Sequence, residues 1–373
     1  MAEAAPIRWR VASDDGGRPG VFSDDELFER HVGIGEYRGL EFLHVNARRV
    51  INQVPAASHV PFRYTINAYR GCSHACSFCF ARPTHEYLGL GIGEDFERRI
   101  VVKVNASERL RAELRDPRWR GEHIAMGTNT DPYQQAEGKY HLTQGIVGAL
   151  GEAANPFSIL TKSTLILRDL DRLVEASRRT TVSTSFSIGT LDEHVWRMSE
   201  PGTPHPRRRV EAIARLREAG IQCGVLVAPV LPGLSDHPDQ LEEVVGACVE
   251  AGAASISAIA LHLRPGVRDH YLGWLRRVRP DLVDMYERRY RGRSYLPKAE
   301  QEALDRLVRR LVESARTRLG LTAAPARVGR ERFGVSPPPG DELRNVGCAS
   351  GGETYSERAA QLSFGLVGLG PAT

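Results

Sequence analysis

The feature that most constrains the fold is an alternation of two kinds of segment between residues 62 and 261. Short apolar, β-branched runs alternate with runs whose apolar residues recur every three to four positions, the spacing of one helix face. The expected strands are 64–69, 122–127, 157–161, 181–187, 221–228 and 254–260. Strand–helix alternation over six units predicts an α/β protein with a parallel sheet and right-handed crossovers. Such a sheet either closes partly into a barrel or lies open as a doubly wound sheet.

The segments outside this alternation suggest the domain boundaries. Residues 1–60 are mixed and broken early by glycine and proline, so we expect an N-terminal extension before a barrel domain at 61–264. Residues 265–320 predict a helical C-terminal extension, and the proline- and glycine-rich residues 321–373 predict a flexible tail. A further short run, 100–104, is either an additional strand or a cover for a sheet edge.

Bulk composition excludes several classes of protein. The chain has 373 residues, of which 41% are hydrophobic and 26% charged, as in globular proteins. No run of eighteen apolar residues exists to span a membrane, and the first residues contain no apolar segment of a secretory signal. We therefore expect a cytoplasmic protein whose clustered thiols stay reduced. The net charge of +4 permits nucleic-acid binding without arguing for it.

Three of the six cysteines fall within eight residues, at Cys72, Cys76 and Cys79. Their spacing, Cys-x3-Cys-x2-Cys, could hold three corners of a cubic iron–sulfur cluster or three positions of one tetrahedral ion. A structural zinc site would need a fourth ligand such as His74 or His85, and no second Cys or His pair follows. A thioredoxin-like pair would leave Cys72 unused. The spacing favours a three-thiolate cluster with one open metal position, which could hold a small molecule through an amine and a carboxylate.

The cysteine stretch resembles the signature of the radical S-adenosylmethionine superfamily, in which an aromatic residue, here Phe78, precedes the last cysteine. The resemblance implies that Cys72, Cys76 and Cys79 ligate a [4Fe-4S] cluster and that S-adenosylmethionine chelates the fourth iron. An electron from a reductant such as flavodoxin or ferredoxin would then cleave the cofactor to methionine and a 5′-deoxyadenosyl radical, which takes a hydrogen atom from a substrate. The family fold is a partial (β/α)6 TIM-like barrel, in agreement with the six units above.

Further sequence segments are similar to those of the spore photoproduct lyase-like group, whose members are often labelled DNA repair photolyase-type enzymes. It comprises NAYRGCSHACSFCFAR, GTNTDPYQQAE, LTKS, EPGTPHPRRRVEAI and APVLPGLSD, within about residues 60–300. The resemblance implies a lyase-like reaction on DNA or RNA as the first substrate class, and radical modification of a peptide or small molecule as the second. The non-catalytic alternative is a zinc or iron–sulfur protein that binds nucleic acid. Spore photoproduct lyase itself uses a further cysteine downstream of the cluster, and the corresponding region, 123–135, contains none.

Polar residues at strand ends are the candidate contacts to the cofactor. Thr128 and Asp131 follow the second predicted strand and could bind the cofactor amine or sugar, although a β-turn at Asp131-Pro132 would also explain them. Lys162 follows the third strand, where the lyase group uses a lysine for the methionyl carboxylate; a solvated lysine is the alternative. Ser183, Ser185 and Ser187 alternate along the fourth strand, and the last two lie nearest the rim.

Several other residues are candidates whose roles the sequence leaves open. Glu200 and Arg209 either position a ligand or pair with each other, and His262 follows the sixth strand as a possible substrate contact. Tyr133 and Cys348 are the candidate catalytic residues, whereas Cys223 lies near the start of its strand and Cys248 on an apolar helix face.

The last two features are a glycine run and a basic stretch. The run from Gly89 to Gly93 lacks the strand–helix context of a nucleotide loop. Between Arg264 and Tyr295, nine arginines, four acidic residues and interleaved aromatics suit phosphate contact and base stacking, or else a salt-bridged pair of helices.

Overall fold

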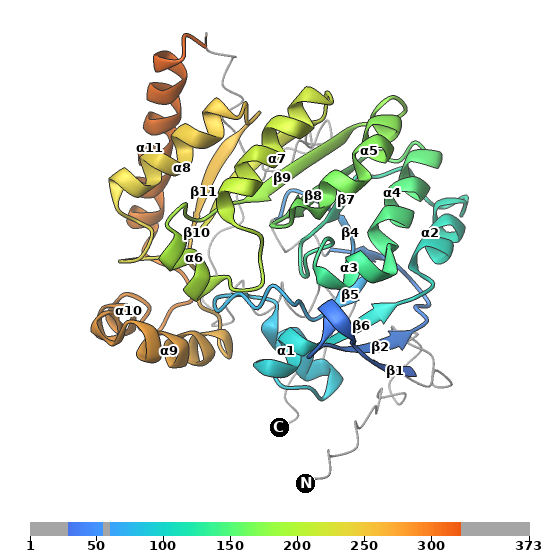
Figure 1. Cartoon of the computed structure of the whole chain (residues 1–373), viewed down its shortest axis with the longest axis horizontal. Helices are drawn as coiled ribbons and strands as arrows, with labels where there is room; N and C mark the ends of the chain where they lie inside the picture. The colour runs from blue at the N-terminus through green and yellow to red at the C-terminus, as the bar shows by residue number, and fades with distance from the viewer. Residues whose placement is uncertain (1–28, 55–59, 322–373) are drawn as a thin grey trace, which may run out of the picture.

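The computed structural model describes residues 29–54 and 60–321 (Figure 1). Its larger sheet has seven strands in the order β11-β10-β9-β8-β7-β4-β3. Neighbouring strands are parallel from β4 through β11, and β3 is antiparallel to β4. The strands are β3 (Ile51–Gln53), β4 (Tyr64–Ile66), β7 (Ile124–Met126), β8 (Phe157–Thr161), β9 (Val182–Ser187), β10 (Gln222–Val230) and β11 (Ile256–Ala260). The six strands predicted from the sequence are therefore confirmed, in sequential parallel order.

A second sheet of four strands, in the order β1-β2-β6-β5, lies beside the first. Its strands are β1 (Glu29–Val32), β2 (Glu41–Val45), β5 (Tyr69–Arg70) and β6 (Arg99–Lys103). The short apolar run at 100–104 is thus a strand, paired in parallel with β2. Because β1, β2 and β3 all precede residue 61, the segment expected as an N-terminal extension contributes strands to both sheets. The predicted tail, from residue 322 onward, lies outside the described residues.

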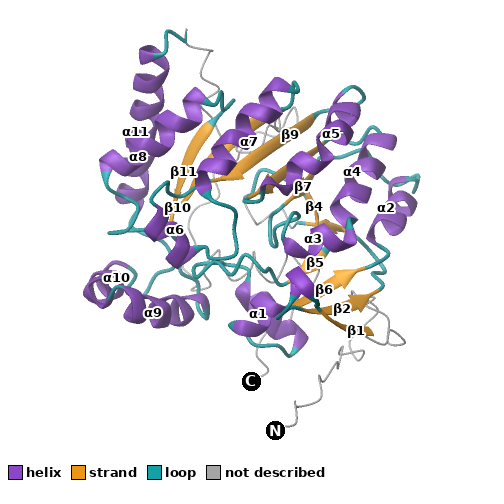
Figure 2. Cartoon of the chain, viewed as in Figure 1, coloured by secondary structure: helices purple, strands orange, loops and turns teal. Residues whose placement is uncertain are grey.

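Helices follow the strands and cover one face of the large sheet, where Figure 2 shows α4, α5, α7 and α8 in a row. The helices are α1 (Glu94–Arg98), α2 (Ala106–Leu114), α3 (Gln135–Tyr140), α4 (Leu142–Glu152), α5 (Leu170–Ser177), α6 (Glu193–Ser199), α7 (Pro206–Glu218), α8 (Pro238–Glu250), α9 (Val267–Val278), α10 (Val283–Arg289) and α11 (Lys298–Arg318). Short 310 helices are η1 (Gly35–Tyr37), η3 (Arg82–Leu88), η4 (Thr164–Asp169) and η5 (Pro280–Leu282). Within the described ranges, no helix is long and apolar enough to cross a membrane.

The two faces of the large sheet differ in chemistry. Ile159, Phe186 and Val225 belong to the main apolar core together with Ile213 of α7 and Leu241 of α8. Since side chains alternate along a strand, the residues between them face the other way, toward the inside of the curved sheet. This inner face is lined mainly by small polar side chains, including Thr65, Ser158, Ser183, Ser185, Ser187 and Ser257. In a closed TIM barrel this space is filled by branched apolar side chains.

The sheet forms a partial barrel, as the sequence predicted. Among the described strands, β11 and β3 are the two edges and do not pair with each other. Helix α11 covers β11 and packs on α8 through Val308 and Ala315, which contact Val245 and Val249. Helices α9 and α10 instead pack against the cysteine segment, because Tyr271 and Tyr286 share an apolar cluster with Cys76 and Phe78.

Candidate active site at the cysteine loop

The three clustered cysteines lie on one loop, residues 71–81, which begins directly after β5 and passes between α6 and α1 (Figure 1). Gly71 starts it with a φ of 77°, and a side chain there would come within 2.9 Å of the Phe96 carbonyl oxygen. Cys72 and Cys76 are buried, Cys79 is half-buried, and all three are free thiols. Burial raises the pKa of each thiol. The thiolate forms therefore need nearby positive charge, such as a metal supplies.

The rim of the large sheet holds the start of this loop. Gln134, in the loop between β7 and α3, accepts a hydrogen bond from the Ser73 amide (3.0 Å) and donates one to the Gly71 carbonyl (3.0 Å). Its side chain is fully buried. Both ends of one amide group are used, which fixes the loop on the β7 end of the sheet. Sequence reasoning missed Gln134, although it lies in the GTNTDPYQQAE segment.

The segment after α6 holds the middle of the loop. The Ser77 amide donates to the Ser199 carbonyl (2.9 Å), and the Gly202 amide donates to the His74 carbonyl (3.1 Å). A side chain at Gly202 would lie 2.1 Å from the Ser73 carbonyl oxygen, so only glycine permits this approach. The cysteine loop thus packs backbone to backbone against the segment that also carries Glu200.

Three predicted site residues, Lys162, Glu200 and Arg209, form one buried charged network. The Lys162 ammonium lies 2.7 Å from one oxygen of Glu200, and the Arg209 guanidinium lies 2.8 Å from the other. Glu200 and Arg209 are almost fully buried. Burial alone would raise the pKa of Glu200, but the charges of Lys162 and Arg209 outweigh it and lower that pKa to about 2. The network carries two positive charges and one negative charge beneath the rim.

Lys162 connects this network to the cysteine loop. Its ammonium lies 5.5 Å from the centre of the Phe78 ring, within the range of a cation–π contact. It also donates to the Ser187 hydroxyl (2.8 Å), which in turn donates to the Ala228 carbonyl (2.7 Å). Residues from β8, β9 and β10 and from the cysteine loop therefore meet at one ammonium group. Ser185, also predicted as a contact, lies one step deeper on the same inner face, opposite Gly224 of β10.

Asp131 organises the neighbouring strand ends. One carboxylate oxygen accepts from the Thr161 hydroxyl (2.7 Å) and the Tyr133 amide (2.9 Å), and the other accepts from the Lys162 amide (2.7 Å). That second oxygen lies 3.5 Å from His74 Nδ1 on the cysteine loop. Asp131 thus bridges β7, β8 and the loop. Thr128 is half-buried beside it in the same turn.

The structure does not bring every candidate to this site. Tyr133 lies in the main apolar core, and its buried hydroxyl, close to Asp169 and Glu137, has its pKa raised by burial and by those carboxylates. Cys223 and Cys248 belong to the same core. Cys348 lies outside the described residues.

His262 lies close to the loop in an aromatic stack. Its ring is 5.7 Å from that of Phe80, which follows Cys79 directly, and 5.4 Å from that of Tyr295. Phe80 is 36% exposed, and the Arg264 guanidinium lies 5.6 Å from its ring centre. Sequence reasoning named His262, Arg264 and Tyr295 separately and missed that Phe80 joins them.

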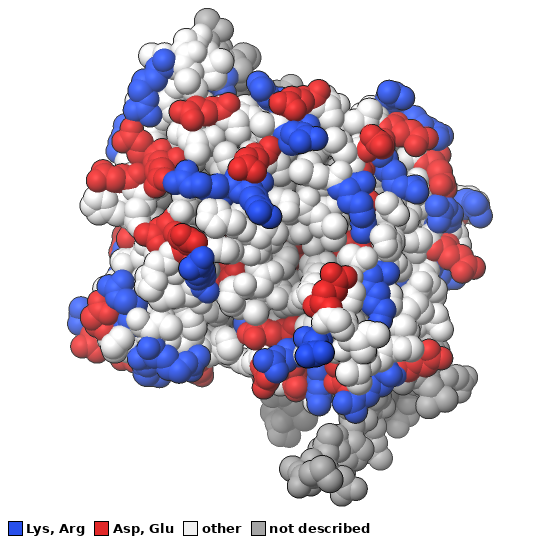
Figure 3. Space-filling model, in the orientation of Figure 1, with Lys and Arg blue, Asp and Glu red and all other residues white. Residues whose placement is uncertain are grey.

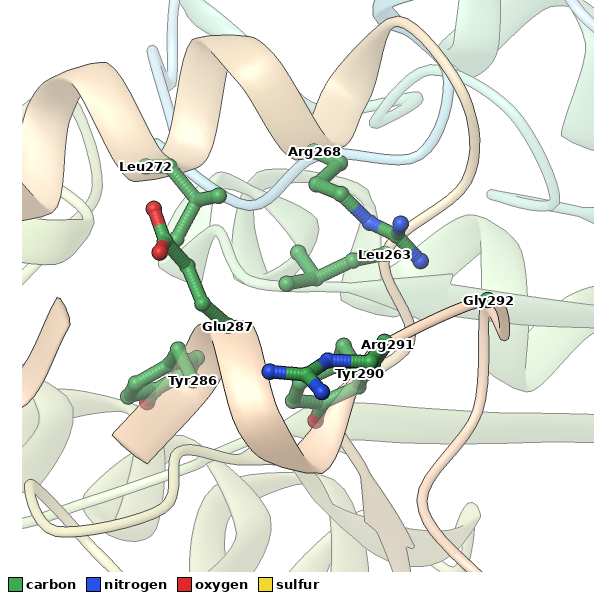
Figure 4. Close-up of a pocket in the computed structure, with 8 residues that line it drawn as sticks. All are labelled: Leu263, Arg268, Leu272, Tyr286, Glu287, Tyr290, Arg291 and Gly292. Atoms are coloured by element: carbon green, nitrogen blue, oxygen red, sulfur yellow. The ribbon is translucent and has the colours of Figure 1, made fainter. Parts of the chain in front are cut away.

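Three of the nine arginines in the basic stretch form ion pairs. Arg276 contacts Glu287 (2.9 Å), Arg279 contacts Asp281 (2.6 Å), and Arg289 contacts Glu300. On the face shown in Figure 3, positive and negative side chains are interspersed. A cavity of about 200 Å³ opens between α9 and α10 (Figure 4) and is lined by Leu263, Arg268, Leu272, Tyr286, Glu287, Tyr290, Arg291 and Gly292. Its lining includes no residue of the cysteine loop, so it is separate from the site.

Two observations test which group the loop fits. One tetrahedral zinc ion would hold its thiolates about 3.8 Å apart, given bonds of about 2.3 Å. Among the described residues, one group of three Cys, His, Asp or Glu side chains has all its ligand atoms within 4.8 Å of one another. It consists of Glu29, His31 and His44, which do not belong to the loop. At least two of the three thiol sulfurs therefore lie more than 4.8 Å apart, farther than one zinc ion holds its ligands and compatible with a larger cluster.

The second observation concerns the space around the thiols. Several buried polar atoms on the inner face and in the loop find no hydrogen-bond partner among the described residues. They are Thr65 Oγ1, Asn67 Oδ1, Ser77 Oγ and Asn129 Nδ2. Buried polar atoms are normally paired, so these atoms are suited to a polar ligand in the same space.

Comparison with known proteins agrees with this geometry. Residues 66–245 match the Radical SAM superfamily, a range that runs from the end of β4 to the middle of α8 and includes the cysteine loop. This chain belongs to the radical SAM superfamily. Membership implies an enzyme that uses an iron–sulfur cluster and S-adenosylmethionine, and that needs a reductant.

Individual relatives match the chain to different extents. An uncharacterised protein of Mycobacterium tuberculosis is 46% identical over 303 residues, covering 81% of this chain and 88% of that protein. A radical SAM Nalpha-GlyT isomerase of Pseudomonas phage M6 is 28% identical over 169 residues, covering 45% of this chain and 33% of the isomerase. A solved structure of spore photoproduct lyase complexed with dinucleoside spore photoproduct has a TM-score of 0.56 at 16% identity, covering 73% of this chain and 79% of the lyase. The last comparison shows that the fold is shared.

Proposed function

We propose that this enzyme holds a [4Fe-4S] cluster on Cys72, Cys76 and Cys79 and uses it to cleave S-adenosylmethionine reductively. The observation that carries the proposal is that three free thiols, none of them exposed, lie on one anchored loop without all being within 4.8 Å of one another, which suits a cluster better than a single ion. When bound, the cluster supplies the electron that generates a 5′-deoxyadenosyl radical, which abstracts a hydrogen atom from the substrate. Flavodoxin or ferredoxin is the expected donor, in a reducing cytoplasm.

The chain's own residues would hold and orient the cofactor. Lys162 and Arg209 together exceed the charge of Glu200 by one, which suits a carboxylate. Asp131 lies on the other side of Lys162 and could accept from an ammonium group, as Thr128 could from a ribose. Ser185 and Ser187 face the inside of the sheet, and Phe78 packs beside the Lys162 ammonium. These residues provide both charge signs and several hydroxyls around one interior space.

For the substrate, we propose a nucleic acid. The Phe80 ring, 36% exposed, follows the last cluster cysteine directly. It lies against His262, which stacks on Tyr295, and Arg264 lies over its face. Exposed aromatic rings beside arginine are suited to stacking of bases and contact with phosphates. The dinucleoside bound in the spore photoproduct lyase structure is consistent with a substrate of this class. Because three arginines of the basic stretch are held in ion pairs, the aromatic stack is a stronger support than the basic stretch.

Deuterium transfer tests the substrate class. DNA, RNA and a peptide pool, each prepared from cells grown in D2O, are incubated anaerobically with the reconstituted enzyme, S-adenosylmethionine and dithionite. Mass spectrometry then measures deuterium in the 5′-deoxyadenosine formed. We expect deuterium from DNA or RNA, and less of it from the Phe80→Ala variant. Deuterium from the peptide pool alone would refute a nucleic-acid substrate and leave the radical chemistry intact.

A further inference from the structure

Arg82 is, with Arg209, one of the two largest fully buried side chains among the described residues, and it lies three residues after Cys79. Its Nε and Nη2 atoms both donate to the Cys76 carbonyl oxygen, at 3.1 and 2.8 Å. Its backbone amide donates to the Cys79 carbonyl oxygen at 3.3 Å. One residue therefore holds the peptide groups of two of the three cysteines.

The other side of the guanidinium is anchored in the neighbouring segment. Nη1 donates to the carbonyl oxygens of Ile92 (2.9 Å) and Gly93 (3.3 Å), and Nη2 lies 2.5 Å from Glu97 of α1. The Phe96 ring packs 5.3 Å from the guanidinium carbon. Ile92 and Gly93 belong to the glycine run that the sequence left without a role. That run presents backbone carbonyls to Arg82, which ties the cysteine loop to α1.

The charge at this position has a defined consequence for a cluster. Arg82 is fully enclosed, whereas the Glu97 side chain is 29% exposed, so solvent screens the carboxylate more than the guanidinium. A reduced cluster carries one more negative charge than an oxidised one, so a fixed cation nearby stabilises the reduced state.

We propose that Arg82 is a positioning residue for the cluster, which holds the loop around Cys76 and raises the reduction potential through its enclosed charge. The inference rests on the proposed function only in assuming that the three cysteines bind a cluster. Lysine could supply the charge but not the planar set of five donors that reaches Cys76, Ile92, Gly93 and Glu97 together.

The test compares four full-length variants with wild type after anaerobic reconstitution: Arg82→Gln, Arg82→Lys, Glu97→Gln and, as an exposed control on α1, Arg98→Gln. The readouts are the midpoint potential from an EPR-monitored redox titration and the rate of iron loss to a chelator. Neither readout requires S-adenosylmethionine cleavage. Among the described residues Arg98 pairs with the exposed Glu94 alone, so its replacement should leave both readouts at wild-type values.

The expected results differ in sign. Arg82→Gln should shift the potential to more negative values and lose iron roughly tenfold faster, the size of effect typical when a residue that orients metal ligands is removed. Arg82→Lys should retain most of the potential but lose iron faster than wild type. Glu97→Gln removes a negative charge next to Arg82, so it should shift the potential to more positive values.

Two results would overturn the inference. One is an Arg82→Gln variant that matches Arg98→Gln in both readouts. The other applies if Arg82→Gln does not fold: a midpoint potential of the Glu97→Gln variant that equals the wild-type value or is more negative. Shifts of the expected sign in a cluster that never cleaves S-adenosylmethionine would support Arg82 and refute the proposed reaction. A wild-type chain that retains no iron would refute both.

Discussion

Replacing Glu200 by glutamine should destabilise the protein far more than a typical surface change. The substitution keeps the shape of the side chain but leaves Lys162 and Arg209 buried without their shared negative charge. The pKa of Glu200 is about 2, against an ordinary value of 4.5, and this difference corresponds to about 3 kcal/mol of stability at neutral pH. Breaking a buried ion pair by removing one partner costs a similar amount, about 3–5 kcal/mol. We therefore expect a loss of about 3–5 kcal/mol.

Urea unfolding followed by tryptophan fluorescence, on the cluster-free chain under reducing conditions, measures this loss. The midpoint should fall at an unchanged slope, and the melting temperature should fall on the order of 10 °C. Glu193→Gln is a matched control, because Glu193 lies at the other end of α6 and pairs with Arg197 in solvent. Exposed pairs of this kind contribute about 0–1 kcal/mol. Equal stability of the Glu200→Gln and Glu193→Gln variants would refute the assigned role of the network.

The stabilisation by Glu200 should also depend on pH, because its pKa is lower in the folded state than in the unfolded state. The difference in unfolding free energy between wild type and Glu200→Gln should be at its full value above about pH 4.5 and should shrink as the pH falls toward 2. A constant difference across that range, in urea titrations, would contradict the assignment. Gly202→Ala should lower iron content after reconstitution, because its side chain meets the Ser73 carbonyl oxygen at 2.1 Å, whereas Gly246→Ala, in open space on α8, should retain iron fully. Phe80→Ala should weaken binding of single-stranded DNA by about 1–3 kcal/mol if one base stacks there; unchanged fluorescence anisotropy titrations would exclude that contact.

The sequence predicted the fold well because the relevant signals are local. The strands of the barrel are short runs rich in β-branched residues, with apolar side chains at least at every second position, and helices between them show one apolar stripe. Right-handed crossovers then leave few arrangements for six such units. The run at 100–104 was ambiguous because its partner β2 lies more than fifty residues earlier and depends on a pairing that no local pattern encodes.

The site was predictable in kind but not in its contacts. The spacing of the three cysteines identified the loop, and strand ends identified Lys162 and Asp131. In contrast, Gln134 and Arg82 resemble ordinary polar residues in the sequence, and their roles depend on which carbonyl groups the fold places beside them. The pairing of Lys162 with Glu200 could not be predicted from the sequence either, because the two residues are 38 positions apart and only the fold brings them together.

The most direct test of the central claim is the fate of S-adenosylmethionine at the cysteine loop. The full chain is reconstituted with iron and sulfide without oxygen, reduced with dithionite and given S-adenosylmethionine, and the products are quantified by liquid chromatography with mass spectrometry. We predict methionine and 5′-deoxyadenosine in equal amounts, both absent from the Cys76→Ala variant. An iron-loaded, reduced wild-type protein that forms no 5′-deoxyadenosine would contradict the account.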